Sequence, residues 1–270
     1  MNTIFADVRS ALYLPASNAR AIEKARGLPC DMVILDLEDA VKPDDKQAAR
    51  EAAVAAVAEG FGPRIAAIRL NGSDSVWHAD DVAAVRASHA AVVVLPKVES
   101  AAEATRVADA VGKPLFAMIE TPAGVLAAVG IAAAHGVAGL IAGSNDLAAT
   151  LRLPPDAGRA PLALSLQTIV LAARAAGIVA LDGVWNRLAD LDGLAEDARA
   201  GRATGFDGKT LIHPNHIAPA NTAFGPTPAE LEDARALVEA ATGGAERFRD
   251  RMIETMHVDA AKRLIARGER

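Results

Sequence analysis

Short apolar runs alternate with longer segments of helix-forming composition along most of the chain. Most runs lack apolar/polar alternation, as expected for strands buried on both faces. We count eight of them: Ser10–Leu14, Met32–Leu37, Ile65–Leu70, Ala91–Leu95, Leu115–Ile119, Gly139–Ala142, Ile178–Leu181 and Thr210–His213. Eight such βα units predict a closed (β/α)8 TIM barrel. A doubly wound open sheet is the alternative, which the lack of a nucleotide-binding glycine fingerprint disfavours.

Two further helical stretches are expected after the last run, at Pro228–Ala241 and Glu246–Arg267, separated by Thr242-Gly243-Gly244. A TIM barrel does not require them. The chain is therefore predicted to contain a catalytic barrel, residues 1–225, and a C-terminal helical arm or lid, residues 226–270. Four apolar residues at steps of four are expected along one helix face of this arm: Met252, Met256, Ala260 and Leu264.

Composition and charge exclude several classes of function. Hydrophobic residues make up 51% of the chain and aromatic residues 3%, so aliphatic side chains must fill the core. The formal net charge of −6 gives no general reason to bind nucleic acid or an anionic membrane. The uncharged stretch Thr121–Asn145 contains Pro122 and divides at His135-Gly136, so we do not expect a membrane span. The N-terminal residues do not resemble a signal peptide, and a cytoplasmic location is expected.

The single cysteine narrows the possible chemistry further. Cys30 has no partner for an intramolecular disulfide and cannot build a thiolate metal cluster. It precedes an apolar run and is expected to be an inert buried thiol. The histidines lack metal-ligand spacing, and His78, His89 and His135 are expected on the surface or at helix ends.

Charged residues close most of the predicted strands. In a TIM barrel the active site lies at the carboxyl ends of the strands. The residues at or beside these ends are Asp36, Glu38, Asp39, Arg69, Lys97, Glu120, Asp146, Asp182, Lys209 and His213. A single charged strand end is equally well explained by a solvated loop, but the set predicts a ring of acids and bases around one mouth. Such a ring needs ion pairing or a bound cation to offset lost hydration.

The donors available in this ring favour Mg²⁺, because oxygen ligands suit hard cations. Glu120 and Asp146 are the best candidate ligands, since they lie at neighbouring strand ends. The guanidinium of Arg69, at the end of the third strand, suits an oxygen that gains negative charge during a reaction. A structural salt bridge from Arg69 to Glu38 or Asp39 is also expected, and it would orient the arginine.

One glycine-containing segment imitates a nucleotide-binding motif. Residues 205–210 end like a phosphate-binding P-loop, but Ala203 stands where that motif requires glycine. The segment also precedes a strand, whereas a P-loop follows one. Binding of ATP or GTP is therefore not expected.

Taken in order, seven segments carry a resemblance to a known family: Arg9–Asn18, Leu35–Val41, Ile68–Asn71, Leu95–Ser100, Met118–Val125, Leu140–Ala148 and Gly205–Ile217. With them the chain resembles the citrate lyase β-subunit-like (CitE-like) branch of the HpcH/HpaI aldolase/citrate lyase superfamily, among relatives of malyl-CoA and citramalyl-CoA lyases. The resemblance covers nearly the whole chain and implies a TIM barrel.

The resemblance also implies an activity. The metal ligands of the family fall on Glu120 and Asp146, and its substrate-binding arginine falls on Arg69. The implied reaction is Mg²⁺-dependent cleavage of a 3-hydroxy-acyl-CoA into acetyl-CoA, or a homologue, and a 2-oxo acid. Asp39 and Lys97, in the same ring, are expected to contact the substrate. Family members are homotrimers or homohexamers, which is the expectation here.

The C-terminal arm departs from the family pattern. Relatives with acyl-CoA lyase activity carry Met-Val/Ile-Asp there, whereas this chain has Met252-Ile253-Glu254. Glu254 is expected to act as acid or base in the site of a neighbouring subunit, on an arm with Gly243-Gly244 as its flexible joint. Should it have no such role, Asp36, Glu38 and Asp39 are the alternatives.

Two other activities stay open at this point. The chain could be a citrate lyase β subunit that acts on citryl-acyl-carrier protein within a complex, or a malyl-CoA thioesterase. For a CoA substrate, phosphate contacts are expected from Arg9, Arg20, Lys24 and Arg26, on the first strand and the helix after it. The alternative for these four residues is a set of solvated surface charges.

Overall fold

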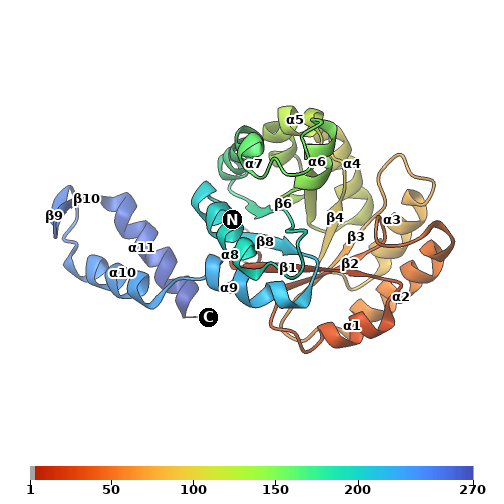
Figure 1. The fold of residues 1–270 in the computed structure, drawn as a ribbon, viewed down its shortest axis with the longest axis horizontal. Helices are drawn as coiled ribbons and strands as arrows, with labels where there is room; N and C mark the ends of the chain where they lie inside the picture. Colours follow the sequence, from red (N-terminus) through yellow and green to blue (C-terminus); the bar gives the residue numbers. More distant parts are fainter. Residues whose placement is uncertain (1–3, 270) are drawn as a thin grey trace. The chain divides into compact units, whose positions relative to one another are not determined.

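The first of two compact units is a closed barrel of parallel strands. The computed structural model describes residues 4–269, and the chain divides between Asn221 and Thr222. Eight strands of the first unit pair in sequence order, and β1 also pairs with β8 (Figure 1). They are β1 (Ser10–Pro15), β2 (Met32–Asp36), β3 (Ile65–Arg69), β4 (Val92–Leu95), β5 (Leu115–Ile119), β6 (Val137–Ala142), β7 (Val179–Asp182) and β8 (Gly208–Leu211). The predicted TIM barrel is confirmed.

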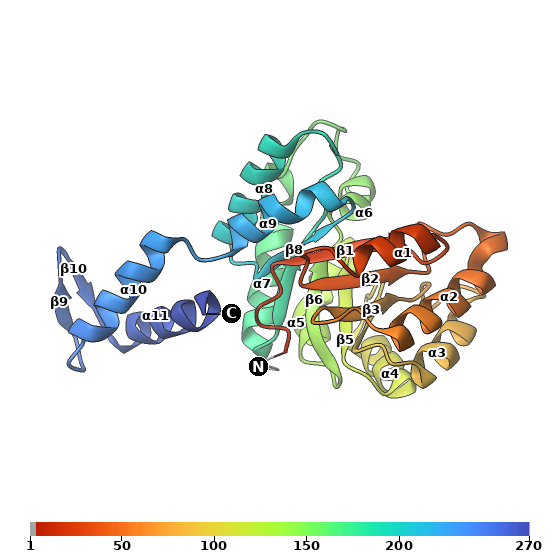
Figure 2. The same ribbon diagram turned by 90° about the horizontal axis from the view of Figure 1, so that it is seen from below.

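Helices surround these strands in both ribbon views (Figures 1 and 2). They are α1 (Ala19–Ala25), α2 (Lys46–Glu59), α3 (His78–Ala87), α4 (Ala101–Val111), α5 (Pro122–Ala132), α6 (Ser144–Thr150), α7 (Ala163–Ala176), α8 (Leu191–Thr204) and α9 (Ile217–Phe224). Local signals fix their ends: α4 begins where Ser100 accepts a hydrogen bond from the Glu103 N–H, and it ends at Gly112, whose φ is 65°. The predicted domain division, after residue 225, lies just past α9.

The interior of the barrel is filled by aliphatic side chains and a few aromatic rings. Phe5 and Phe116 meet edge to face, with their ring centroids 5.1 Å apart. A side chain at Gly139 would collide with the ring of Phe116, so glycine is required at that position. This core holds the strands in the register that places the polar strand ends.

The eighth strand lies two residues earlier than predicted. It runs from Gly208 to Leu211, not from Thr210 to His213, so Lys209 lies within the strand and His213 beyond it. Gly208 passes so close to the backbone of Val8 and Arg9 that a Cβ would collide with it. The polar sequence Gly-Lys-Thr therefore forms strand because the barrel closes there through close backbone contact, which apolar periodicity does not reveal.

The second unit combines two helices with a short hairpin. α10 (Pro228–Ala240) packs on α11 (Thr255–Gly268), and β9 (Glu246–Phe248) pairs antiparallel with β10 (Arg251–Ile253). The prediction of one helix over Glu246–Arg267 is therefore wrong for its first part. Phe248 and Ile253 turn inward to join the small core of this unit, which a hairpin allows.

The predicted apolar stripe of the arm is also wrong. Met252 belongs to β10, and the side chains of Met252 and Met256 are exposed. Of the predicted residues only Leu264 packs inward, and the other apolar residues on that face of α11 are Val258, Ala261 and Ile265. Gly243 and Gly244, with φ of 102° and 121°, precede the hairpin inside this unit.

The uncharged stretch Thr121–Asn145 and the single cysteine both belong to the folded barrel. The stretch Thr121–Asn145 folds as α5, β6 and the start of α6, and none of the helices within residues 4–269 is long and apolar enough to cross a bilayer. Cys30 is buried as expected, and burial raises the pKa of its thiol to about 11.

Candidate active site

A buried arginine forms the centre of the polar mouth. Arg69, the last residue of β3, lies opposite Asp36, the last residue of β2, in the parallel register. Its Nε and Nη2 each donate to one Asp36 carboxylate oxygen at 2.7 Å. Burial disfavours the charge of Arg69, but its hydrogen bonds to Asp36 and the nearby negative charges of Asp36 and Glu38 together outweigh burial and raise its pKa. This forked pair fixes the plane of the guanidinium.

Glu38 links the arginine to a lysine. Its Oε2 lies 2.8 Å from Nη1 of Arg69, and its Oε1 accepts a 2.8 Å hydrogen bond from Nζ of Lys97. Burial raises the pKa of Glu38, while the two cations oppose the shift. Asp39 lies at the edge of this group, 3.9 Å from Arg69 and largely exposed. The predicted salt bridge from Arg69 to Glu38 is therefore present, with Asp36 as the stronger partner.

A buried lysine supports the loop that carries these acids. Nζ of Lys46 donates to the carbonyl oxygens of Leu37 and Glu38 and to Oδ1 of Asn71, at 2.6 to 2.7 Å. Asn71 in turn donates to Asp81. Lys46 was not singled out from the sequence, because it begins a helix and its burial follows only from the folded loop.

Glu120 forms the acidic side of the mouth. Its carboxyl group is buried and accepts a 2.7 Å hydrogen bond from the backbone N–H of Lys97, whose φ is 53°. Burial, together with the negative charges of Glu38 and Asp146, raises the pKa of Glu120 to about 7. A Cβ at position 143 would collide with the Glu120 side chain, so Gly143 makes room for it.

Glu120 and Asp146 fit the ligand set of a Mg²⁺ ion. Mg²⁺ is commonly held by one or two carboxylates and completes its coordination with water and substrate oxygens. Within residues 4–269 no group of three or more His, Cys, Asp and Glu side chains is arranged to hold a metal. A cation here would relieve the unfavourable charge of the buried Glu120. Asp146, in the first turn of α6, is half exposed, and its Oδ2 lies 3.7 Å from Nζ of Lys97.

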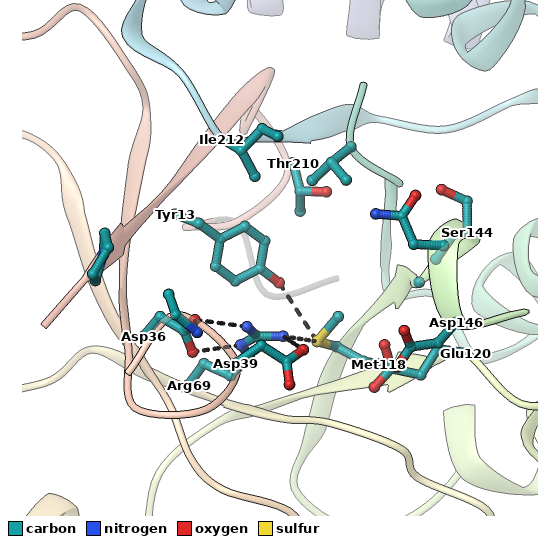
Figure 3. A pocket seen from close by; sticks show the side chains of 16 residues that line it. Tyr13, Asp36, Asp39, Arg69, Met118, Glu120, Ser144, Asp146, Thr210 and Ile212 are labelled. Atoms are coloured by element: carbon teal, nitrogen blue, oxygen red, sulfur yellow. Dashed lines mark hydrogen bonds and ion pairs between the residues drawn. The ribbon is translucent and has the colours of Figure 1, made fainter. Parts of the chain in front are cut away.

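Part of this group lines a cavity of about 380 Å³ at the carboxyl ends of the strands, whereas Glu38 and Lys97 are not among the lining residues. Figure 3 shows Arg69 and Asp36 on one side of it, Glu120 and Asp146 on the other, and Tyr13 between them. The cavity can therefore hold a small anionic group between a cationic and an acidic wall. Of the residues predicted from strand ends, the lining includes Asp36, Asp39, Arg69, Glu120 and Asp146.

Tyr13 and Met118 also line the cavity, and sequence reasoning missed both. The Tyr13 ring covers the guanidinium of Arg69 at 4.9 Å, and its hydroxyl donates to Sδ of Met118 at 3.5 Å. Both residues lie within strands, not after them. Their positions in the segments that carry the family resemblance were the available signal.

Asp182 and Lys209 belong to a separate buried cluster. Nζ of Lys209 bonds to Asp182 at 3.1 Å and to Asp197 at 2.5 Å, and Arg159 pairs with both acids. Lys209 and Asp182 do not line the cavity that contains Arg69 and Glu120. Arg159 and Asp197, from the segment before α7 and from α8, carried no strand-end signal.

The predicted CoA-binding residues do not form one cluster. Arg9 precedes β1 and pairs with Asp31 at 2.8 Å, at the amino end of the strand, whereas Arg20 lies beyond the carboxyl end. The six residues of β1 separate the two by roughly 20 Å. Arg20 and Lys24 are exposed on α1, and Arg26 pairs with Glu59.

The other residues considered from the sequence are four histidines and Glu254 of the C-terminal arm. His89 and His135 are exposed as expected, but His78 at the start of α3 is buried and bonds through Nδ1 to the Asn71 carbonyl. His213 lies beyond β8 and is not part of the cavity lining. Glu254 belongs to the second unit, where its backbone N–H donates to Nδ1 of His257 at the start of α11.

The chain is similar in sequence and structure to known proteins over nearly its whole length. The (3S)-malyl-CoA thioesterase of Cereibacter sphaeroides strain ATCC 17025 is 43% identical, over 97% of this chain and 94% of its own length. Citrate lyase subunit beta of Escherichia coli K12 is 32% identical, over 97% and 93%. The structure of protein CitE from Mycobacterium tuberculosis, in complex with magnesium, acetoacetate and coenzyme A, superposes with a TM-score of 0.81 at 32% identity, covering 97% and 98%.

A family model gives the same assignment independently of single relatives. The model described as HpcH/HpaI aldolase/citrate lyase matches residues 9–214, which include every strand of the barrel. Together with the full-length relatives, this match confirms the resemblance seen in the sequence. The chain belongs to the HpcH/HpaI aldolase/citrate lyase family.

Proposed function

We propose that this protein hydrolyses the thioester of a malyl-CoA-type 3-hydroxy-acyl-CoA in a Mg²⁺-dependent reaction. The observation that carries the proposal is the cavity with Arg69 on one wall and Glu120 and Asp146 on the other. Its volume of about 380 Å³ suits a four-carbon acyl group. The 43% identity to a malyl-CoA thioesterase over nearly the whole chain favours hydrolysis as the outcome.

Carbon–carbon cleavage of the same substrate, to acetyl-CoA and a 2-oxo acid, is the second candidate. It is favoured by membership of the aldolase family and by the similarity to citrate lyase subunit beta. Either reaction places negative charge on the thioester carbonyl oxygen. The same cation-lined wall would serve both reactions.

Glu120 and Asp146 would hold the Mg²⁺ ion. When bound, the ion supplies Lewis-acid polarisation of the carboxylate and hydroxyl oxygens of the substrate. Arg69, fixed by Asp36 and Glu38, then faces the carbonyl oxygen and stabilises its developing charge. Lys97, bonded to Glu38, and the exposed Asp39 complete the polar rim that contacts the substrate.

The acid or base of the reaction is proposed to be Glu254 of a neighbouring copy in a homotrimer or homohexamer. Asp36 and Glu38 are already paired with Arg69 and Lys97, so their carboxylate oxygens are occupied by these cations. The phosphates of CoA are proposed to bind Arg20 and Lys24 on α1. Arg9 is left out of this proposal because it lies at the other end of β1.

Mg²⁺ is expected to raise the melting temperature more at pH 8 than at pH 6. The pKa of Glu120 is raised to about 7, so stability from its protonated form is complete at low pH and is lost as pH rises through 7. The cation restores stability at pH 8, whereas at pH 6 it must displace a proton and binds about tenfold more weakly. Differential scanning fluorimetry measures both shifts. Equal shifts at the two pH values, or a full shift in Glu120→Gln, would contradict the assignment.

The products of malyl-CoA turnover decide between the two candidate reactions. With Mg²⁺, the protein is expected to release free CoA and intact malate, detected by mass spectrometry and a thiol assay. Acetyl-CoA with glyoxylate would instead establish the lyase. A Glu120→Gln variant should form neither set of products, and absence of both from the unaltered protein would refute the proposed function.

Charge reversal on α1 tests the CoA-binding residues. The double substitution Arg20→Glu and Lys24→Glu is expected to raise KM for malyl-CoA roughly tenfold, because two phosphate contacts become repulsive. The Mg²⁺ thermal shift should not change. The matched control reverses two exposed arginines on α4 and α8, Arg106→Glu and Arg199→Glu, and should leave KM within about twofold. An unchanged KM in the α1 variant would mean that its charges only face solvent.

Subunit complementation tests Glu254. Glu254→Gln keeps the side-chain size and is expected to lower kcat by about 10² to 10⁴ without changing the Mg²⁺ thermal shift. Co-expression of Glu254→Gln with Glu120→Gln should restore part of the activity if Glu254 acts in a neighbouring site. Full activity of the single Glu254→Gln variant would remove it from the mechanism and leave Asp39 as the candidate base.

A further inference from the structure

Two hydrogen-bond donors in the cavity converge on one weak acceptor. The Tyr13 hydroxyl donates to Sδ of Met118 at 3.5 Å, and Nη1 of Arg69 donates to the same sulfur at 3.9 Å. Figure 3 shows both contacts meeting at the sulfur, between the wall of Arg69 and the wall of Glu120. A thioether sulfur is a poor acceptor, so neither donor is well satisfied there.

The two donors are held in place by groups that do not depend on Met118. Asp36 fixes two nitrogens of the guanidinium, and the Tyr13 ring stacks over that guanidinium at 4.9 Å. Tyr13 itself lies in β1, which pairs with β2 and β8. The methionine, in contrast, has a flexible unbranched side chain that can move aside. The pair of donors is therefore preorganised, and its present acceptor is replaceable.

The Tyr13 hydroxyl is suited to donate its proton in a hydrogen bond and not to lose it. Burial is the largest cause that raises its pKa, and the acids around the cavity add to the shift against the opposing effect of Arg69. The group stays neutral across the range in which the enzyme would work. A neutral donor beside a guanidinium can bind an oxygen that becomes negatively charged without adding a mobile proton to the site.

We propose that Tyr13 is a catalytic residue whose hydroxyl, together with Nη1 of Arg69, binds the thioester carbonyl oxygen of the substrate in place of the Met118 sulfur. This assignment deepens the proposed function and rests on it for the identity of the substrate. The oxygen enters the position between the two donors, and the methionine side chain swings away. Tyr13 thereby forms one half of an oxyanion-binding pair.

The hydrogen bond strengthens as the reaction proceeds. In hydrolysis, water forms a C–O bond to the thioester carbon while a base takes its proton, and the C=O π electrons move to the bound oxygen. The electrons then return, the C–S bond breaks, and the thiolate leaves as CoA and takes up a proton. In carbon–carbon cleavage, the substrate hydroxyl loses its proton and the electrons of the broken bond reach the same oxygen as an enolate. Tyr13 stabilises the charge in both cases.

The test uses the full-length protein with Mg²⁺ and malyl-CoA. Tyr13→Phe removes the hydroxyl but keeps the ring over Arg69, and it is expected to lower kcat about 10²-fold while raising KM no more than about fivefold. The Mg²⁺ thermal shift should equal that of the unaltered protein. Thr168→Val is the matched control: it removes a hydroxyl from the exposed face of α7 and keeps the bulk, and kcat should stay within about threefold. Equal losses in both variants, or full kcat in Tyr13→Phe, would overturn the proposal.

A binding measurement separates this proposal from the proposed reaction. Acetyl-CoA carries the carbonyl oxygen, and S-ethyl-CoA lacks it. Calorimetry should show the unaltered protein binding acetyl-CoA about fivefold more tightly, and Tyr13→Phe should lose that preference. If malyl-CoA is not turned over but this result is obtained, the reaction is wrong and the Tyr13 contact stands. A preference that survives in Tyr13→Phe, or binding of neither ligand, refutes the contact.

Discussion

The buried charge of Arg69 is the constraint on which the rest of the site depends. A guanidinium withdrawn from water is tolerated only when carboxylates surround it. Because β2 and β3 pair in parallel register, Asp36 lies beside Arg69 and takes both of its forked hydrogen bonds. The same carboxylate accepts the backbone N–H groups of Glu38 and Ala40. The charge of Arg69 thus orders the loop after β2 through Asp36. Lys46 also holds this loop, because its Nζ donates to the carbonyl oxygens of Leu37 and Glu38.

The opposite wall of the cavity, around Glu120, carries a buried negative charge that needs a cation. Glu120 is buried near Glu38 and Asp146, and its raised pKa records how unfavourable a third negative charge is there. A divalent cation held by Glu120 and Asp146, as proposed, would remove this penalty. Arg69 then offers positive charge from the other side. With the proposed cation in place, the two walls would create a field suited to the proposed anionic substrate, whose charge moves toward the arginine during the reaction.

The part of the candidate site that follows from topology could be predicted from the sequence. Glu120, Asp146 and Arg69 could be predicted because the carboxyl ends of barrel strands converge, whatever the details of packing. Tyr13 could not, since its direction depends on how β1 sits in the closed barrel. Arg9 was grouped with Arg20 because the two residues are close in sequence. The sequence distance did not reveal that β1 lies between them and holds them apart. The hairpin before α11 was missed because its apolar residues, such as Phe248, also fit a helical spacing.

The chemistry that this site performs depends on which group handles the proton. Within the described barrel, Asp36 pairs with Arg69, and Glu38 lies between Arg69 and Lys97. Glu120 and Asp146 are the proposed ligands of the cation. Asp39 is exposed, 3.9 Å from Arg69. If Glu120 and Asp146 hold the cation as proposed, most of the acids around the cavity already have a partner. The proposed reaction therefore takes its acid or base from Glu254 of a neighbouring copy, and a glutamate at that position reaches further than an aspartate would.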